Sequence, residues 1–270
     1  MKKFSFLGTA LLFTTLFAAS VTAQSTDEEW TGFYVGGYVG VTNGRTSANT
    51  STVYSDSGYF ATSSVPAINS AGAQRFNSNG FTGGGQFGYT KQFGRIVIGA
   101  EADFGAQRVD ADDVVTADYP CCASDFTVYQ AAKSDWLFTA RPKVGVTAGK
   151  ALIYGTGGVA VTNLKYAGLF TDTDSDAIES ADFDTTRTGY TVGGGVEVKV
   201  AKNWSVKGEY LYADFGRESV TSNNLNTEAF IDLVAAPSGI PARENYPENT
   251  FTRSANLKTH SVRFGVNYRF

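Results

Sequence analysis

The sequence predicts an all-β protein: an eight-stranded antiparallel up-and-down transmembrane β-barrel with short periplasmic turns and long extracellular loops. Three observations lead to this fold class. Large apolar residues occupy every second position in about eight segments, which is the period of a β-strand. The connections between these segments are alternately short and long. Aromatic residues gather in two bands near the segment ends, as they do at the two surfaces of a membrane.

The first residues form an export signal. Lys2 and Lys3 precede an apolar run, and small residues end this region at Ala23. The apolar run is about 14 residues long, which is short of the roughly 20 that a spanning helix needs. Such a pattern is a secretory signal peptide, cleaved after Ala23. We therefore expect residues 1–23 to be the signal peptide and residues 24–270 to form the outer-membrane barrel domain.

The composition suits an all-β chain and offers no general attraction for nucleic acid. The 270 residues include 26 acidic and 22 basic side chains, for a formal net charge of −4. This balance gives no basic surface for a polyanion. Thirty glycines and an aromatic content of 14% are typical of strands and tight turns.

The expected strands are each near the 9–11 residues that cross a bilayer with tilt. In the third, Ile96 and Ile98 share one face while Glu101 and Asp103 lie on the other. The pattern is less regular in the fifth, where we take Leu152 and Tyr154 as the apolar face. The expected strands cover residues 32–41, 81–91, 95–109, 134–148, 151–165, 187–200, 203–215 and 260–270.

A soluble β-sandwich would also show alternation, with its apolar faces turned inward. Three features favour a membrane barrel instead: charged residues at mid-strand, the alternating connection lengths, and the two aromatic bands. The short connections are 92–94, 149–150 and 201–202, and the long ones are 43–79, 109–133, 166–186 and 216–257. One band holds Phe33, Tyr89, Tyr154, Trp204, Tyr268 and Phe270, and the other holds Phe81, Phe104, Trp136, Tyr190 and Tyr212.

If the apolar faces contact lipid, the charged residues of the strands point into the barrel. Unpaired buried charge is costly, so these groups should pair across strands. The expected interior groups are Glu101, Asp103, Arg141, Lys143, Glu197, Lys199, Lys207, Glu209, Arg263 and Arg269. An eight-stranded barrel is narrow enough for side chains to fill it. We interpret the set as a polar plug without catalytic activity, although a thin water path through it stays open as an alternative. Pro142 should cause a bulge or a bend, because a proline removes a ladder hydrogen bond.

Two loop features resemble binding sites only in part. Asp172, Asp174 and Asp176 imitate the start of a calcium loop, but Ala177 stands where the sharp turn needs glycine, and Phe183 where the loop needs glutamate. An EF-hand is therefore rejected, and we expect a solvated acidic loop, with weak divalent-ion binding as the alternative. No cofactor and no metal site are predicted.

The only cysteines and the only histidine are the remaining candidates for chemistry. Cys121 and Cys122 could form a ring between neighbours, pair between chains, or stay reduced. His260 should face outward at the start of the last strand, while Ser261 points the other way. Some lipid-modifying barrels carry an outward His-x-Ser pair, but position 262 is valine. The pattern therefore argues against an enzyme.

Several segments resemble those of small eight-stranded outer-membrane barrels, namely the porin-like surface proteins, the transmembrane domain of OmpA and opacity-type surface antigens. They are "WTGFYVGGYVG" at residues 30–40, "GGGQFGY", the hairpin "GVEVKVAKNWSVKGEYLYADFG", and "VRFGVNYRF" at the end. The resemblance covers essentially the whole mature chain. It implies the Gram-negative outer membrane and a terminal aromatic, Phe270, that the barrel assembly machinery reads. It does not imply a ligand.

These observations favour an integral outer-membrane protein with a structural or surface-interaction role. A porin-like channel for small solutes is the alternative, and a lipid-modifying enzyme that uses His260 is the second. The expected partners are outer-membrane lipid, the barrel assembly machinery and an unidentified surface ligand bound by the extracellular loops. We expect a monomer.

Overall fold

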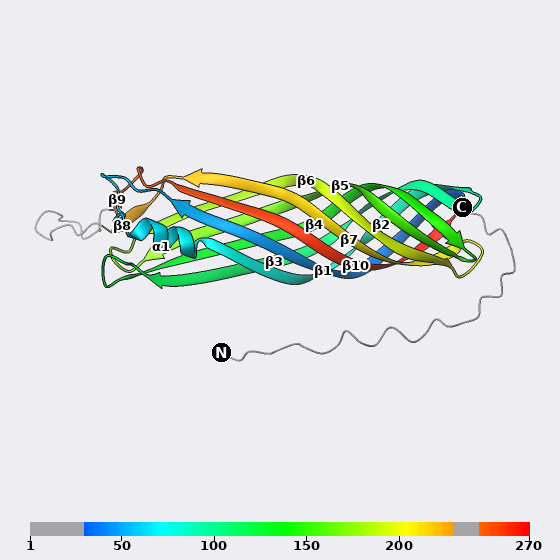
Figure 1. Ribbon diagram of the computed structural model, residues 1–270, viewed down its shortest axis with the longest axis horizontal. Coiled ribbons are helices and arrows are strands. Elements are labelled where there is room, and N and C mark those ends of the chain that lie inside the picture. The colour runs from blue at the N-terminus through cyan, green and yellow to red at the C-terminus, as the bar shows by residue number, and fades with distance from the viewer. Residues whose placement is uncertain (1–29, 229–242) are drawn as a thin grey trace, which may run out of the picture.

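The computed structural model describes residues 30–228 and 243–270. The predicted signal peptide and its cleavage site at Ala23 lie outside this part of the chain. The described residues form a long cylinder of strands, with Phe270 at one end and a short helix at the other (Figure 1).

A closed ring of eight long antiparallel strands builds the cylinder within the described ranges. Each strand pairs with the next one in sequence, and the last pairs with the first, so the ring has no open edge. Closure gives the backbone N–H and C=O groups of every strand hydrogen-bond partners on both sides, which a barrel in lipid requires. The strands are β1 Gly32–Thr52, β2 Ala73–Phe93, β3 Ile96–Asp118, β4 Asp125–Ala148, β5 Ala151–Asp172, β6 Ile178–Lys199, β7 Trp204–Ser222 and β10 Phe251–Arg269.

The connections at the two ends of the cylinder differ. Beside the carboxy terminus, β2–β3, β4–β5 and β6–β7 are joined by tight turns, two of which use Gly94 and Gly149 at positive φ angles of 61° and 58°. At the other end lie helix α1 (Ser64–Ala71) and a small hairpin of β8 (Asn226–Glu228) and β9 (Arg243–Asn245). In residues 30–228 and 243–270, no helix has the length and apolar character needed to cross a membrane.

The strands are longer than predicted, and this corrects the expected extracellular loops. They contain between 19 and 24 residues rather than 9–11, so most of segments 109–133 and 166–186, and nearly half of segment 43–79, is barrel wall. Their many Ser, Thr, Asn and Asp residues are typical of loops. A strand that lies in water can, however, turn such polar residues outward, and it needs only small or medium-sized apolar residues on its inward face.

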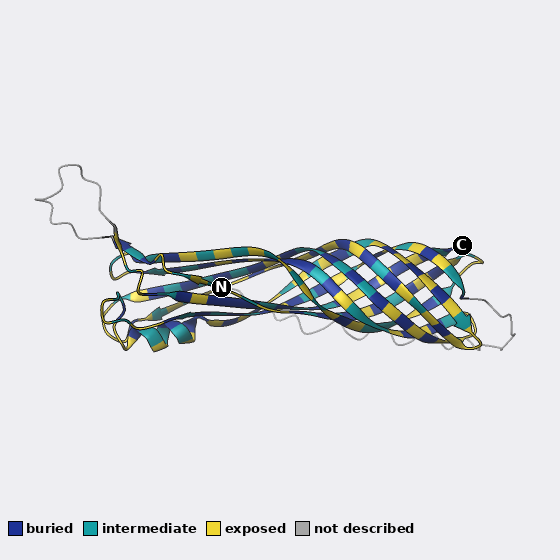
Figure 2. Cartoon of the chain, turned by 90° about the horizontal axis from the view of Figure 1, so that it is seen from above, coloured by how far each residue is buried: buried dark blue, intermediate teal, exposed yellow. Residues whose placement is uncertain are grey.

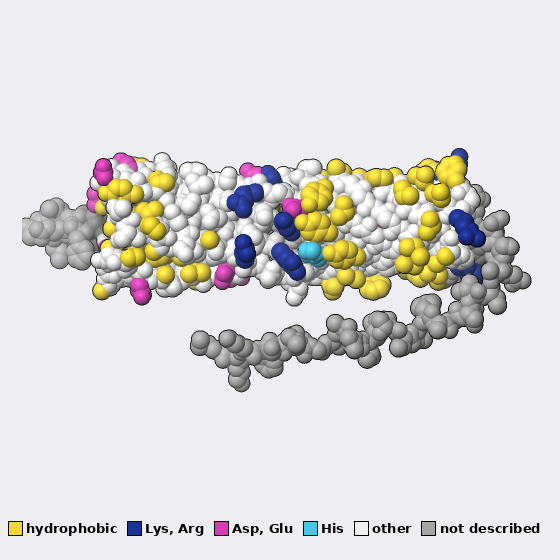
Figure 3. Space-filling view, in the orientation of Figure 1, with side chains coloured by type: hydrophobic (Ala, Val, Ile, Leu, Met, Phe, Trp, Pro, Cys, Tyr) yellow, Lys and Arg dark blue, Asp and Glu magenta, His cyan; other side chains and the backbone are white. Residues whose placement is uncertain are grey.

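The direction of the apolar side chains reverses along the barrel axis. Near the carboxy terminus, Phe33, Val35 and Phe264 are exposed on the outside while charges are buried inside. Farther along β3, Val109 and Ala111 point inward and are buried, whereas Asp110 and Asp112 are exposed. The alternation of exposed and buried residues is visible along the strands (Figure 2), and most of the large exposed apolar residues lie in the carboxy-terminal part of the cylinder, where they gather on the face shown in Figure 3. The belt therefore marks the membrane-spanning half.

Two local predictions differ from the structure, the first entirely and the second in one of its two alternatives. Leu152 and Tyr154 point into the barrel, with exposed fractions of 0% and 5%, and Ile153 is the lipid-facing residue. All three are apolar or aromatic, so the sequence pattern could not choose between the faces. At Pro142 the β4–β5 register is the same on both sides, so the expected bulge is absent, but Arg141 and Pro142 have no partner in the β4–β5 register, in agreement with the loss of a ladder hydrogen bond. The irregularity in β4 falls between Lys133 and Leu137 instead.

The interior is filled in layers. A cluster of Trp30, Val97, Leu152 and Tyr154 lies at the carboxy-terminal end. The charged layer follows, and then two apolar clusters occupy the half beyond the belt. The first is built mainly from small and aliphatic residues together with Phe76, Tyr166 and Phe215, and the second is rich in aromatics and includes Ile68 of α1. The outer half thus has a core like that of a soluble barrel.

Candidate functional site

The membrane-spanning half holds a network of buried ion pairs. Eight of the ten predicted interior charges belong to it, four acidic and four basic: Glu101, Asp103, Glu197, Glu209, Arg141, Lys143, Lys207 and Arg263. All eight side chains are nearly inaccessible to solvent. They come from β3, β4, β6, β7 and β10, so the network ties together strands from around the ring.

Glu101 lies at the centre of the network. Its Oε1 is 2.8 Å from Arg141 Nη2 and 2.8 Å from Lys207 Nζ. Its Oε2 accepts a hydrogen bond of 2.8 Å from the hydroxyl of Tyr34 and lies 3.8 Å from Lys143 Nζ. Both carboxylate oxygens are therefore occupied, as a buried charge requires.

The remaining carboxylates extend the network in two directions. Asp103 binds Arg141 at 2.8 Å and Arg263 at 3.0 Å. Glu197 accepts a hydrogen bond from Lys143 at 3.0 Å, and Glu209 forms an ion pair with Arg141 Nη1 at 3.2 Å. Every carboxylate of the network therefore has at least one cationic partner.

The other two predicted charges surround Trp30. Arg269 donates to the carbonyl oxygens of Trp30 and Gly32 at 2.8 and 3.2 Å, and to Thr90 Oγ1 at 2.7 Å. Its guanidinium carbon lies 5.4 Å from the Trp30 ring centre, and Lys199 Nζ lies 5.2 Å from it. Trp30 is fully buried, so these contacts close the carboxy-terminal mouth of the barrel.

Three tyrosines of the network are not among the predicted interior residues. Tyr34, Tyr38 and Tyr154 are buried and donate to Glu101, Asp103 and Glu209 respectively. The signal was present in the inward-facing glycines. A Cβ atom on Gly88, Gly105 or Gly195 would lie 2.5–2.7 Å from one of these hydroxyls, so each glycine makes room for a ring from another strand.

A second buried ion pair lies in the outer half. Arg253 of β10 binds Glu179 of β6, with both side chains fully excluded from solvent. Arg253 also donates to Thr50 Oγ1 at 3.3 Å. The hydroxyls of Thr50 and Tyr166 both bond Gln130, at 3.1 and 2.8 Å. This polar layer separates the two apolar clusters and was absent from the predicted charge set, because its segments were expected to be loops.

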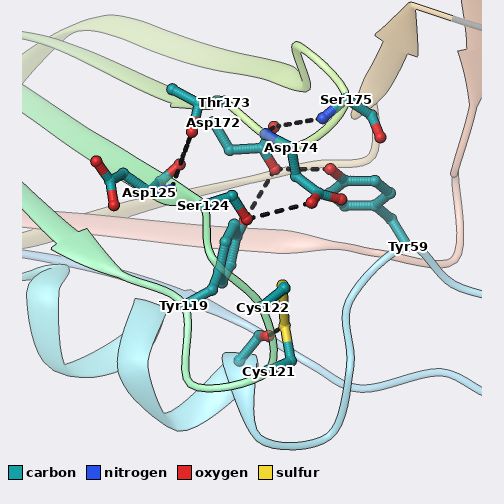
Figure 4. Close-up of a disulfide and its surroundings, with 11 residues drawn as sticks. Tyr59, Tyr119, Cys121, Cys122, Ser124, Asp125, Asp172, Thr173, Asp174 and Ser175 are labelled. Atoms are coloured by element: carbon teal, nitrogen blue, oxygen red, sulfur yellow. Dashed lines mark hydrogen bonds between the residues drawn. A yellow bond between two sulfur atoms is a disulfide. The ribbon is translucent and has the colours of Figure 1, made fainter.

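At the outer end, Asp172 organises three connections (Figure 4). One carboxylate oxygen accepts from the hydroxyls of Tyr59 and Tyr119 at 2.8 and 2.9 Å. The other accepts from the backbone N–H groups of Asp174, Ser175 and Ala177. Burial, together with the Asp172 carboxylate, raises the pKa of both tyrosines above the ordinary range. The expected solvated acidic loop is therefore partly ordered by its first aspartate.

The cysteines beside this cluster form a disulfide between neighbours, Cys121–Cys122. Ser64 of α1 contacts Cys121 at 3.4 Å, so the disulfide packs against the helix. Within the described part of the chain, no group of three or more His, Cys, Asp or Glu side chains is arranged to hold a metal ion.

His260 lies on the outside of the barrel, at the edge of the apolar belt that is farther from the carboxy terminus. Its Nδ1 is 2.7 Å from the hydroxyl of Tyr210, and its ring is 5.1 Å from that of Tyr212. Ser261 points inward and bonds Thr42 at 2.9 Å. Phe270 is 71% exposed at the opposite rim, where its N–H donates to Phe33 at 3.0 Å.

A closed antiparallel ring with an apolar outer belt and a charged interior defines a transmembrane β-barrel protein. The chain belongs to the outer membrane protein beta-barrel domain family, whose sequence model matches residues 9–270. The protein is therefore an integral protein of the Gram-negative outer membrane.

Two relatives are similar in sequence. The 31 kDa outer-membrane immunogenic protein of Brucella melitensis is 32% identical over 202 residues, which are 74% of this chain and 70% of the relative. The 22 kDa outer membrane protein of Rhizobium leguminosarum bv. viciae is 34% identical over 136 residues, covering 50% of this chain and 53% of the relative. Among solved structures, Neisserial surface protein A is 13% identical, with a TM-score of 0.31, and the match covers 88% of this chain and 97% of that one.

Proposed function

We propose that the protein is a non-catalytic surface protein: a filled barrel that anchors a rigid projection and presents its outer end for contact with other molecules. The observation that carries this proposal is the filling of the interior from end to end. Trp30, the charged layer and two apolar clusters succeed one another along the axis. A filled interior favours anchoring over transport.

The length of the strands supports the second part of the proposal. In β1 the outward apolar residues end at Val41, yet the strand continues to Thr52. At about 3.4 Å per residue, the 11 residues beyond Val41 extend for about 37 Å along the strand. The extension carries α1 and the Asp172 cluster at its tip, held by side-chain and backbone hydrogen bonds. The similar Brucella melitensis protein is named as immunogenic, which agrees with exposure of such a projection.

Site-directed labelling of intact cells tests the presentation of the tip. Ser57→Cys lies in the exposed connection between β1 and α1, and Lys150→Cys lies in the tight turn at the opposite end. A membrane-impermeant maleimide should label Ser57→Cys on intact cells and Lys150→Cys only after the outer membrane is opened. The native cysteines are joined to each other and give a low background. Labelling of Lys150→Cys on intact cells would overturn the proposed orientation.

Planar-bilayer recording tests the closed interior. The purified protein should give no stable single-channel conductance, because the charged layer leaves each carboxylate bound to a cation. A discrete conductance that grows when Arg141→Ala removes the side chain bridging Glu101 and Asp103 would favour the porin-like channel instead. A deletion strain that loses attachment to surfaces or cells, and regains it with the full chain, would support the surface role.

A further inference from the structure

The outer wall carries a cationic patch just beyond the belt on the face formed by β10, β1 and β2. Arg45 of β1 and Arg75 of β2 are exposed on this face. Arg45 lies opposite Asn77, two residues from Arg75, so the two arginines are diagonal neighbours across adjacent strands. Figure 3 shows Lys and Arg side chains gathered beside the end of the apolar belt.

This patch lacks its own counter-charge. Arg45 pairs in register with Lys258 of β10, so two cations face each other across adjacent strands. The nearby carboxylate, Asp214, is bound to Lys258 at 3.2 Å. Among the described residues, Arg45 and Arg75 have no ion-pair partner. The Nε of Arg45 donates only to Asn43 Oδ1, at 3.3 Å.

Lysines at a similar height around β3, β4 and β5 are arranged differently. Lys133 binds Asp110 at 3.3 Å, and Lys165 binds Asp135 at 3.0 Å. Like charges placed opposite each other destabilise a strand pair. Arg45, which faces Lys258, and its diagonal neighbour Arg75 have no such carboxylate among the described residues, so an external anion would relieve the repulsion around them.

Two adjoining hollows give this face an amphipathic shape. The lower hollow, of about 530 Å³, lies at the belt edge, where its walls include Val41, Val262 and Tyr210. The upper hollow, of about 510 Å³, includes Arg45 and Arg75. Asn43 and Asn79 line both hollows, so the two form one continuous surface that is apolar below and cationic above.

We propose that this face binds a phosphate-bearing lipid of the outer leaflet, with an acyl chain in the lower hollow and a phosphate held by Arg45 and Arg75. The belt edge is the level at which lipid headgroups lie. Guanidinium groups bind phosphate through paired hydrogen bonds, and such charge-assisted bonds are stronger than neutral ones. The site is separate from the filled interior and from the outer tip, so it does not depend on the surface role proposed above.

Lipid binding to the detergent-solubilised full-length protein tests this site by native mass spectrometry. The probes are diphosphoryl lipid A, the same lipid with both phosphates removed, its deacylated phosphorylated disaccharide, and inorganic phosphate. The diphosphoryl lipid should bind at least about tenfold more tightly than any other probe, since it alone offers both the chain and the charge. Equal binding of the dephosphorylated lipid, or of inorganic phosphate, would overturn the proposal.

Two double variants locate the site. Arg45→Gln with Arg75→Gln should weaken binding of diphosphoryl lipid A by about tenfold or more, because the phosphate loses the charge-assisted hydrogen bonds of both guanidinium groups. Lys133→Gln with Lys165→Gln removes the same charge from the paired lysines and should leave binding unchanged. Equal effects of the two double variants would show a general charge effect and refute the site. The lipid comparison on the unaltered protein stands even if one variant fails to fold.

Discussion

Arg253 of β10 and Glu179 of β6 form an ion pair from which solvent is fully excluded, in the half of the barrel that lies beyond the membrane. Neither strand is the direct neighbour of the other, because β7 lies between them. The pair thus connects strands across the interior, between two apolar clusters. The outer half is therefore a folded unit with its own buried ion pair between strands, rather than a set of loops.

Removal of one partner of this pair should destabilise the outer half. Glu179→Ala leaves Arg253 buried without a counter-charge, and we expect a loss of about 3–5 kcal/mol in the free energy of unfolding. Urea denaturation in detergent measures the change. Glu218→Ala, which breaks the partly exposed pair with Arg187, should cost no more than about 1 kcal/mol. Replacement of both buried partners, Glu179→Leu with Arg253→Met, should recover much of the loss. Equal costs for the two single variants would contradict the structural role of the buried pair.

The reversal of side-chain direction predicts opposite tolerance to charge at two positions of β3. Ile98 and Val114 have similar exposed fractions, 49% and 52%, on the outside of the wall. Ile98→Arg places a charge against lipid and should cost about 2 kcal/mol, between the values for the bilayer centre and its surface. Val114→Arg faces water and should be nearly neutral. Membrane insertion and urea stability check both, and similar damage from the two would mean that the belt extends beyond its assigned edge.

The tyrosines at the outer tip should resist ionisation in alkaline solution. Burial and Asp172 raise the pKa of Tyr59 and Tyr119 in the folded state. Their neutral forms therefore stabilise the tip fully below the unfolded pKa of about 10, and this contribution is lost as the pH rises above that value. Absorbance titration at alkaline pH should show a late-ionising group of tyrosines. Asp172→Asn should move that group toward the ordinary range, and an unchanged titration would contradict the assignment.

Deletion of Phe270 can distinguish two roles of this residue, a signal for barrel assembly and an aromatic side chain at the membrane surface. Deletion of Phe270 should reduce insertion of newly made chains more than it reduces the urea stability of formed barrels. Its ring is 71% exposed and lies edge-to-face with Tyr268, so the folded barrel should lose little. Phe33→Ala is the matched control, because Phe33 is 67% exposed at the same rim but is not terminal. If both variants inserted equally well, Phe270 would be a rim residue without a signal role.

The membrane-spanning half could be predicted because lipid and a charged interior impose opposite demands on alternate residues. Charges at mid-strand, such as Glu101 and Arg141, have one tolerable direction, and their partners must come from other strands. Prediction failed where both faces of a strand were apolar. Leu152, Ile153 and Tyr154 gave no contrast, and only the contact of Leu152 with the Trp30 cluster decides which face lies inside.

By itself, the sequence determined the eight lipid-crossing segments, the tight turns between them and the charges that must be buried. The tertiary structure alone decided that the polar segments beyond the belt continue as strands, that Arg253 meets Glu179, and which carboxylate each base contacts. The physical reason is the distance along the sequence between the residues that interact. Alternation within one segment depends only on the solvent or lipid on either side of that segment. Pairing across the ring depends on the register of every strand, and a one-residue irregularity such as that in β4 turns the following side chains to the other face.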